Sequence, residues 1–224
     1  MKILITGSTG MVGKGVLLEC LDDSKVDDVI VINRKKLDLE HPKLKEIIHS
    51  DFYDITSLKD SLADLNAVFF CLGISSLGLS EEKYAHVTFD IVKHFADVIH
   101  SINPNIVFNY VTGSGSDSSE KGRIMWARIK GKTENYILSK NFKDAYMFRP
   151  GAIIPERGIK SKTNWYSIIY VLLKPFYPLM KRSKNITTTV KIGRAMLNSI
   201  AINQPKKHLE NADINLLATV TTNH

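Results

Sequence analysis

Residues 2–13 read KILITGSTGMVG, and this stretch decides the expected fold. A short apolar run ends at Thr6, and three glycines follow it at a spacing of three before a helical pattern begins. Glycine allows a tight turn and a close approach of the backbone to a pyrophosphate, while the following helix presents free N–H groups. The stretch therefore predicts a strand, a dinucleotide-binding turn and a helix; the alternative is a tight turn without a ligand. The residues expected to bind the dinucleotide here are Gly7, Ser8, Thr9, Gly10, Met11, Val12 and Gly13.

Short apolar runs alternate with helical periods from the N-terminus to residue 151, a pattern typical of a parallel sheet covered by helices on both faces. The chain is therefore expected to form an α/β, Rossmann-like doubly wound parallel sheet. The expected strands are 2–6, 28–34, 44–51, 67–73, 105–113 and 145–151. The expected helices between them are 11–23, 55–65, 80–102 and 123–140.

The alternation stops after residue 151, and the charge balance changes in the same region. Residues 1–155 hold 19 Lys/Arg and 20 Asp/Glu, whereas the segment from Arg157 to Lys207 holds 11 Lys/Arg and no acid. The formal net charge of +7 therefore arises in the C-terminal third. We expect residues 1–155 to form an NAD(P)-binding domain, and residues 156–224 to form a small, mainly helical C-terminal lobe of the same compact unit.

The end of the second strand indicates which dinucleotide is bound. NAD-binding folds place Asp or Glu there to hold the ribose 2′-hydroxyl, whereas this chain has Asn33, Arg34, Lys35 and Lys36. A carboxylate would repel a 2′-phosphate, and a guanidinium can bind one with two hydrogen bonds. NADP(H) is therefore expected in preference to NAD(H), with Asn33, Arg34 and Lys35 at the site. The alternative is that the three cations form a solvated turn.

Other features of the sequence argue against a metal centre or secretion. Cys20 lies in a helical pattern and Cys71 ends an apolar run, so both are expected to be buried thiols and not a disulfide. The sequence has no CxxC or HExxH motif and no cluster of His and Asp, so no metal site is expected. The apolar part of the N-terminal MKILITG is too short for a signal peptide, which predicts a cytoplasmic protein.

Together these residues resemble the short-chain dehydrogenase/reductase superfamily, in its extended or atypical branch, whose glycine signature is TGxxGxxG. The resemblance covers residues 1–155 and implies further cofactor contacts. Asp51, with Phe52 beside it, matches the residue that caps the adenine amino group. Cys71-Leu72-Gly73 matches the strand end that lines the cofactor ribose, and Arg149-Pro150-Gly151 matches the turn beside the nicotinamide. Within the superfamily the chain is most similar to small NAD(P)H-binding, oxidoreductase-like proteins of the Tat-interactive-protein kind.

The resemblance also implies a Tyr-x-x-x-Lys pair, in which Tyr is the general acid and Lys lowers its pKa and binds the nicotinamide ribose. One helical turn of spacing places both side chains on the same face. Tyr136 and Lys140 match this spacing literally, but too few residues then remain to end the helix and enter the next strand. Lys130, with Glu134 four residues later, leaves room for a full helix and matches the superfamily's Lys-x-x-x-Glu continuation. The second register is favoured, and it places Trp126 where the Tyr is expected.

An indole N–H donates a hydrogen bond but does not release its proton near neutral pH, so Trp126 cannot be a general acid. Its ring could stack against cofactor or substrate, and the alternative is a packing residue. Thr112 or Ser114 takes the position of the superfamily's hydroxyl and could polarise a carbonyl, while Lys130 would hold the ribose. Tyr84, early in the helix at 80–102, is a further candidate for lining the site, with packing as its alternative role.

Residues 164–184 read NWYSIIYVLLKPFYPLMKRSK, an apolar and aromatic stretch that ends in cations and is too interrupted to span a membrane. Its alternative roles are a cover over the substrate pocket, as in the resembling superfamily, a contact within a homodimer, or a peripheral contact with an anionic membrane surface. Residues 186–202 are expected to form an amphipathic helix, and 208–218 a short closing element. Nucleic acid is not expected as a partner, because the basic residues follow no recognisable reader motif.

Two functions remain as alternatives. The first is an oxidoreductase that passes hydride between NADPH and a small carbonyl compound, with Thr112, Ser114 and Lys130 in the site and its proton donor unidentified. The second is an NADP(H)-binding redox sensor or scaffold without turnover. Trp126 favours the second function, whereas the hydroxyls and Lys130 favour the first. The sequence names no substrate.

Overall fold

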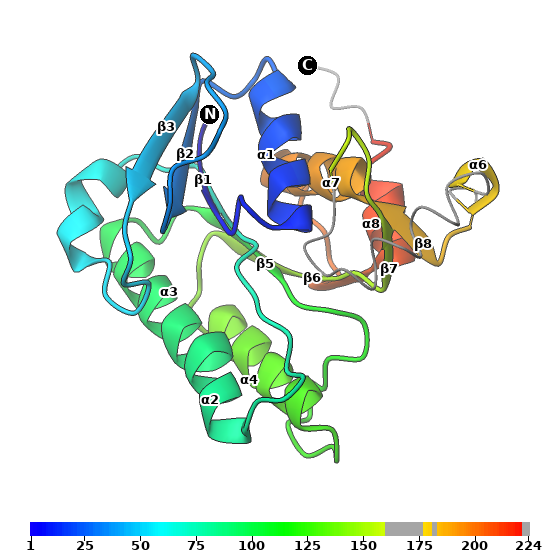
Figure 1. Cartoon of the computed structure of the whole chain (residues 1–224). Helices are drawn as coiled ribbons and strands as arrows, with labels where there is room; N and C mark the ends of the chain where they lie inside the picture. The colour runs from blue at the N-terminus through cyan, green and yellow to red at the C-terminus, as the bar shows by residue number, and fades with distance from the viewer. Residues whose placement is uncertain (160–176, 181–182, 221–224) are drawn as a thin grey trace.

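The computed structural model describes residues 1–159, 177–180 and 183–220. Its main feature is a seven-stranded sheet in the order β3-β2-β1-β4-β5-β6-β9, in which every neighbouring pair is parallel (Figure 1). The strands are β1 (Lys2–Thr6), β2 (Asp28–Asn33), β3 (Leu44–Ile48), β4 (Ala67–Phe70), β5 (Val107–Val111), β6 (Asp144–Arg149) and β9 (His208–Glu210). The predicted Rossmann-like parallel sheet is therefore confirmed.

The strand order reverses at β1, which pairs with β2 on one side and with β4 on the other. Thr6, the last residue of β1, consequently lies between Ile32 and Phe70. The connections after β1 and after β4 leave the sheet toward opposite sides, which opens a crevice above the carboxyl ends of these strands. Open parallel sheets bind their ligands at such a reversal point.

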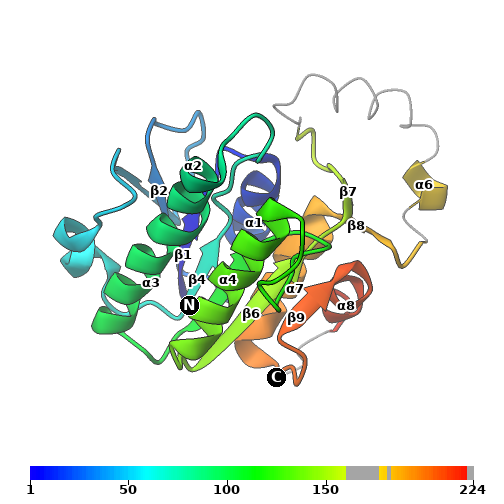
Figure 2. The same ribbon diagram turned by 90° about the horizontal axis from the view of Figure 1, so that it is seen from below.

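Helices cover both faces of the sheet (Figures 1 and 2). One face carries α1 (Met11–Asp22), α7 (Thr189–Ala201) and α8 (Asn211–Leu217). The other face carries η1 (Thr56–Leu62), α2 (Glu81–Ala85), η2 (His86–Asp90), α3 (Ile91–Ile102) and α4 (Met125–Ser139). Residues of β1 alternate between the two cores: Ile3 and Ile5 pack beneath α1 and α7, whereas Leu4 packs beneath α3. The doubly wound arrangement is thus set by strands that are apolar on both faces.

The helix predicted at 55–65 differs from the regular α-helix that its pattern suggested. It is a 3₁₀ helix, η1, limited to Thr56–Leu62. The carboxylate of Asp54 accepts hydrogen bonds from the backbone N and the Oγ1 of Thr56, at 2.8 and 2.6 Å. Such local side-chain bonds favour short turns over a long helix. A positive φ of 58° at Asp64 then redirects the chain toward β4.

The helix predicted at 80–102 is continuous, but its middle is a π-helical turn, η2 (His86–Asp90), between α2 and α3. A π turn changes the hydrogen-bonding pattern of the backbone and often occurs at functional sites. The carbonyl of Thr88, within this turn, accepts a hydrogen bond of 3.2 Å from Oγ1 of Thr133 on α4. The turn therefore joins two helices beside the crevice.

The C-terminal residues are built into the sheet and its helical cover. β9 extends the sheet beyond β6, and β8 (Ile186–Thr188) pairs in parallel with β7 (Ala152–Ile154). The helix predicted at 186–202 was therefore wrong in its first three residues, because they pair with β7 and Thr188 caps α7 by accepting a hydrogen bond from the N of Lys191. A further short helix is α6 (Tyr177–Met180).

α7 packs closely on α1 because glycines line their contact. A Cβ atom at Gly15 would lie 2.5 Å from Cβ of Thr189, and one at Gly193 would lie 2.8 Å from Cβ of Glu19. Real Cβ atoms do not approach so closely, so larger residues at either position would push the helices apart. α7 thereby supports α1, the helix that follows the glycine turn.

Most of the stretch 164–184, namely residues 164–176 and 181–182, lies outside the described part of the chain. The roles predicted for this stretch remain predictions. Among the helices of the described residues, none combines the length and the apolar character required to cross a bilayer.

Candidate cofactor and substrate site

The glycine turn after β1 has no room for a side chain at Gly7 or at Gly13. Gly7 has a φ of +69°, and a Cβ atom there would lie 2.6 Å from the backbone carbonyl carbon of Cys71. A Cβ atom at Gly13 would lie 2.2 Å from the carbonyl oxygen of Gly7, which also accepts a hydrogen bond of 2.9 Å from the N of Gly10. The turn is folded on itself and against β4, so only glycine fits at its first and last positions.

The N-terminus of α1 opens directly from this turn. Gly10 is the N-cap residue and has no side chain to bond the first N–H groups, and the first turn contains no acidic residue. The first N–H groups of a helix lack intrahelical partners, and they attract anions together with the helix dipole. The diphosphate of a dinucleotide fits this site. The first N–H groups of α1 can donate to it, the glycines leave space that a Cβ atom would fill, and no carboxylate in the first turn would repel it.

A cleft of about 280 Å³ lies above the carboxyl ends of β1, β4 and β5. It contains part of the glycine turn, the segment that follows β4, the end of β5 and side chains from three helices. Its lining residues are Gly10, Met11, Val12, Gly13, Cys71, Leu72, Gly73, Ile74, Tyr84, Thr88, Tyr110, Val111, Thr112 and Lys130. Cofactor candidates that are distant in sequence are thus brought together at one site.

Exposed cations follow the end of β2, and the carboxylate of Glu46 beside this strand accepts hydrogen bonds from the protein. The Asn33 amide is held on both sides: its Oδ1 accepts from Oγ of Ser8 at 2.8 Å, and its Nδ2 donates to Glu46 at 2.9 Å. Glu46 also accepts from the backbone N of Leu37 at 2.9 Å. Arg34 is exposed, as are Lys35 and Lys36, and within the described residues Arg34 makes no ion pair.

Asp51 and Phe52, both expected at the adenine, differ in exposure. Asp51 is exposed after β3, and its Oδ1 accepts a hydrogen bond of 2.9 Å from the N of Tyr53. The Phe52 ring is buried in the core beneath α3. Of this pair, only Asp51 offers its side chain to a ligand.

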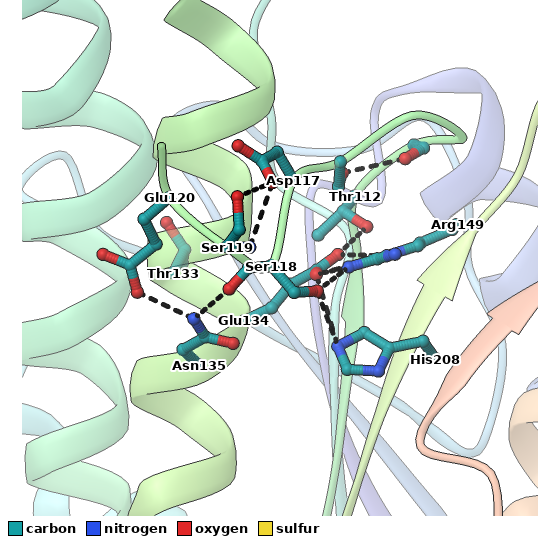
Figure 3. A network of polar contacts seen from close by, with 12 residues as sticks. Thr112, Asp117, Ser118, Ser119, Glu120, Thr133, Glu134, Asn135, Arg149 and His208 are labelled. Carbon is teal, nitrogen blue, oxygen red and sulfur yellow. Dashed lines mark hydrogen bonds and ion pairs between the residues drawn. The ribbon is translucent and has the colours of Figure 1, made fainter. Parts of the chain in front are cut away.

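The loop after β5 is fastened to α4 where that helix has a glycine. The N of Asp117 donates to the carbonyl of Ala127 at 3.0 Å, and a Cβ atom at Gly131 would lie 1.7 Å from the carbonyl oxygen of Asp117. The Asp117 carboxylate accepts from the hydroxyl and N of Ser119 and from the N of Gly122, which lowers its pKa. Asp117 therefore shapes the loop, as Figure 3 shows.

Beneath this loop lies a buried charge network centred on Glu134, which is fully inaccessible to solvent (Figure 3). Its carboxylate accepts from Oγ1 of Thr112 at 2.6 Å and from Nε of Arg149 at 3.0 Å, with a second bond from Nη2. Nη2 of Arg149 also donates to Oγ of Ser118 at 2.6 Å, and Nε2 of His208 lies 3.5 Å from Glu134. The network as a whole therefore connects α4, β6 and β9 to the loop after β5.

Two residues that were predicted at the site take part in this network. The Thr112 hydroxyl, expected to polarise a carbonyl, donates to Glu134, and Arg149, expected beside the nicotinamide, serves the same carboxylate. Ser114 is exposed, and its N donates to the carbonyl of Pro150 at 3.1 Å, which holds it next to Gly151. Ser114 is therefore the accessible one of the two candidate hydroxyls.

Lys130 enters the cleft from α4. Its Nζ donates to the carbonyl oxygen of Thr112 at 2.9 Å and lies 5.8 Å from the ring centroid of Trp126. The Trp126 ring in turn would lie 3.4 Å from a Cβ atom at Gly115. Burial lowers the pKa of Lys130 below its ordinary value, and the charge of Glu134 offsets this only in part.

The model of the NAD dependent epimerase/dehydratase family matches residues 3–145 of this chain. The chain belongs to this family. Protein HTATIP2 of Rattus norvegicus is 24% identical over 204 residues, which cover 89% of this chain and 81% of that protein. Protein FMP52, mitochondrial, of Meyerozyma guilliermondii is 22% identical over 158 residues, which cover 70% of this chain and 67% of that protein.

Solved structures of similar fold include Gre2 in complex with NADPH from Candida albicans, with a TM-score of 0.71 and 16% identity over 94% of this chain and 77% of that one. UDP-glucose 4-epimerase with UDP-glucose from Thermotoga maritima has a TM-score of 0.70 and 13% identity over 97% of this chain and 81% of that one. At such identities the likeness shows the fold alone. With the family match, the predicted membership of the short-chain dehydrogenase/reductase superfamily is confirmed.

The two registers considered for the family's Tyr-x-x-x-Lys pair lie in different surroundings. Lys130 lines the cleft, with Trp126 one turn before it on α4. The Tyr136 hydroxyl instead donates to Asp97 on α3, and Nζ of Lys140 pairs with the same carboxylate at 2.8 Å. Burial raises the pKa of Asp97, but hydrogen bonds from Lys140, Tyr136 and Lys93 outweigh it and lower that pKa to about 2. Tyr136 and Lys140 thus belong to a helix–helix contact.

The cleft of this family member also contains aromatic hydroxyls. Tyr84 is buried on the cleft wall, where burial raises its pKa against the opposing effect of a hydrogen bond with Thr88. Burial likewise raises the pKa of Tyr110, which lines the cleft from β5. Sequence reasoning missed Thr88 as a lining residue. From its position two residues before Thr112 it placed Tyr110 below the cofactor, whereas Tyr110 lines the cleft. In the part of the chain that the structure describes, no group of three or more His, Cys, Asp or Glu side chains could hold a metal.

Proposed function

We propose that this protein is an NADP(H)-dependent oxidoreductase acting on a small carbonyl compound. The observation that carries the proposal is that the tight glycine turn and the Lys130 ammonium lie in one cleft above β1, β4 and β5. A nicotinamide cofactor, when bound, supplies hydride to a carbonyl carbon. The residues of this chain bind that cofactor, orient the substrate and supply the proton that the substrate oxygen takes up.

The residues at the carboxyl ends of the strands bind different parts of the cofactor and substrate. The turn at residues 7–13 and the N-terminus of α1 hold the diphosphate, and Asp51 accepts a hydrogen bond from the adenine amino group. The segment 71–73 lines a ribose, and one free N–H of Lys130 donates to the nicotinamide ribose. Ser114, exposed beside residue 151, donates a hydrogen bond to the substrate oxygen.

The preference for NADP(H) rests on charge at the end of β2. Glu46, the carboxylate bonded to Asn33, already accepts hydrogen bonds from Asn33 and Leu37, and the exposed residues that directly follow β2 are the cations Arg34, Lys35 and Lys36. A guanidinium binds a 2′-phosphate with charge-assisted hydrogen bonds, each contributing about 1.5–3 kcal/mol. Gre2, which is similar in fold, has been solved in complex with NADPH, and this supports the preference.

Isothermal titration calorimetry with NADPH and NADH tests the cofactor. We expect tighter binding of NADPH, and we expect Arg34→Ala to weaken it about 10- to 100-fold while leaving NADH binding nearly unchanged. Lys59→Ala removes an exposed cation from η1 and serves as the matched control. Failure of both nucleotides to bind would overturn the proposal at its base.

Steady-state oxidation of NADPH against a panel of aldehydes and ketones tests the reaction. The expected result is turnover with at least one compound, lost in the Gly13→Ala variant, whose Cβ would meet the Gly7 carbonyl. The second candidate function is an NADP(H) sensor without turnover. It is favoured by the Thr112 hydroxyl, which is held by Glu134, and by Trp126 one turn before Lys130. Tight NADPH binding with no turnover, unchanged in Trp126→Tyr, would support it.

A further inference from the structure

Four ionisable side chains line the cleft among the described residues: Cys71, Tyr84, Tyr110 and Lys130. A carbonyl reduction needs one proton for the oxygen, and the donor must regain it from water near neutral pH. Burial raises the pKa of Cys71 to about 12, and burial also raises the pKa values of both tyrosines. Lys130 alone among these four shifts in the opposite direction.

Within the described residues, one hydrogen bond holds the ammonium of Lys130. An ammonium has three N–H donors, and one of them bonds the carbonyl oxygen of Thr112 at 2.9 Å. The nearest residue along the helix with a carboxylate, Glu134, is committed to Thr112 and Arg149, and no ion pair joins it to Lys130 in the described residues. A Cβ atom at Gly113 would lie 3.4 Å from Nζ, so Nζ lies directly beside this glycine on the loop after β5.

The other groups near Nζ do not relay a proton. The Trp126 ring faces Lys130 at 5.8 Å from its centroid, and an indole N–H keeps its proton near neutral pH. The Thr112 hydroxyl is directed to Glu134 instead of the cleft. Among these groups of the described residues, Nζ of Lys130 is therefore the one that lines the cleft and can release a proton.

We propose that Lys130 is itself the proton donor of this enzyme, in place of a phenol. The inference rests on the proposed oxidoreductase function and deepens it. As hydride adds to the carbonyl carbon and forms the C–H bond, the C=O π electron pair moves onto the oxygen. The oxygen takes a proton from Nζ, so that an O–H bond forms and an N–H bond breaks. Lys130 is left as a neutral amine and regains its proton from water, while the nicotinamide cofactor has been oxidised by two electrons.

The first test compares activity and binding in lysine variants. General acids contribute on the order of 10²–10⁴-fold, so Lys130→Ala should lower kcat by that factor. NADPH affinity, measured separately by calorimetry, should fall much less, since the diphosphate and adenine contacts remain. Lys132→Ala, a change two residues away on α4 at a side chain that packs on Phe89 outside this cleft, should retain activity and binding.

Small primary amines then test the role of Nζ directly. Methylamine and ethylamine should restore part of the activity of Lys130→Ala, with a restored rate that depends on the amine's pKa. An inactive Lys130→Ala variant that still binds NADPH and that no amine rescues would overturn the inference.

A measurement independent of turnover uses competitive labelling with acetic anhydride, which reacts with neutral amines. Half-maximal labelling of Lys130 is expected at a pH below the usual lysine range of about 10.4, with labelled peptides quantified by mass spectrometry. A midpoint at or above that range would contradict the proposal. Turnover by the wild-type protein that survives in Lys130→Ala would overturn this inference alone. An inactive wild-type protein with NADPH bound would overturn the oxidoreductase function together with it.

Discussion

Replacing Glu134 by alanine should destabilise the protein strongly, because this carboxylate balances a buried positive charge. Glu134 is completely buried, and the side chain of Arg149 beside it is 12% exposed. The substitution leaves the guanidinium with only Ser118 as a hydrogen-bond partner in this network and deprives the Thr112 hydroxyl of its shortest acceptor. Breaking a buried ion pair from one side costs about 3–5 kcal/mol, most of it from the uncompensated charge.

The change in melting temperature distinguishes a buried ion pair from a solvent-exposed one. In a domain of this length, 1 kcal/mol shifts the melting temperature by roughly 2–4 °C, so Glu134→Ala should lower it by roughly 6–20 °C. Asn135→Ala provides the control, since Asn135 bonds the same loop through the carbonyl of Ser118 and the carboxylate of Glu120. Its loss should cost only about 0.5–1.5 kcal/mol per hydrogen bond.

Urea unfolding followed by circular dichroism, with a double-variant cycle, measures the pair itself. Arg149→Met alone should destabilise the protein, because it leaves the Glu134 carboxylate buried without its cation. The double variant Glu134→Leu with Arg149→Met should be more stable than either single variant, since two apolar side chains replace the two charges. Additive losses, or a loss below about 1 kcal/mol in Glu134→Ala, would refute the assignment of a buried, mutually dependent pair.

Three further predictions concern single side chains. Gly13→Ala should cost about 1–3 kcal/mol of stability, as overpacking does, and calorimetry should also show weaker NADPH binding, because its Cβ would displace the Gly7 carbonyl. Tyr136→Phe should leave NADPH oxidation unchanged while lowering the melting temperature, because its hydroxyl bonds Asp97; loss of turnover would restore the literal Tyr-x-x-x-Lys register. Burial lowers the pKa of His208, so the stability that this residue contributes is complete above about pH 6.5 and is lost as the pH falls below it. His208→Gln should flatten this fall in urea titrations at pH 5–7.

Much of the fold could be predicted because each strand carries its own signal. The runs at β1, β2 and β4 are apolar on both faces, and this is the pattern of strands covered by helices on both sides. The 3₁₀ form of η1 and the π turn η2 could not be predicted, because they depend on other parts of the chain. The π turn lies where Thr88 meets Thr133 of α4, a contact between residues 45 positions apart.

Part of the geometry of the candidate site was predictable. The tight turn at Gly7 and Gly13 and the position of Lys130 on α4 follow from adjacent residues, whereas the roles of these residues toward a cofactor remain predictions. The partner of the Thr112 hydroxyl was not predictable, because Glu134 becomes available only when β5 and α4 pack together. The sequence shows that Thr112 has a hydroxyl, but the acceptor of its hydrogen bond is determined by how β5 and α4 pack.

Thr112 connects the cleft to the buried network through its two polar groups. Its carbonyl oxygen accepts the hydrogen bond that positions Nζ of Lys130, and its hydroxyl donates to Glu134. Glu134→Ala should therefore affect the cleft as well as stability, because the loop after β5 loses the anchor that fixes Thr112. At a temperature where the variant is still folded, we expect weaker NADPH binding in calorimetry, whereas Asn135→Ala should bind NADPH like the wild type. Equal NADPH affinity in a folded Glu134→Ala variant would show that the network stabilises the protein without positioning Lys130.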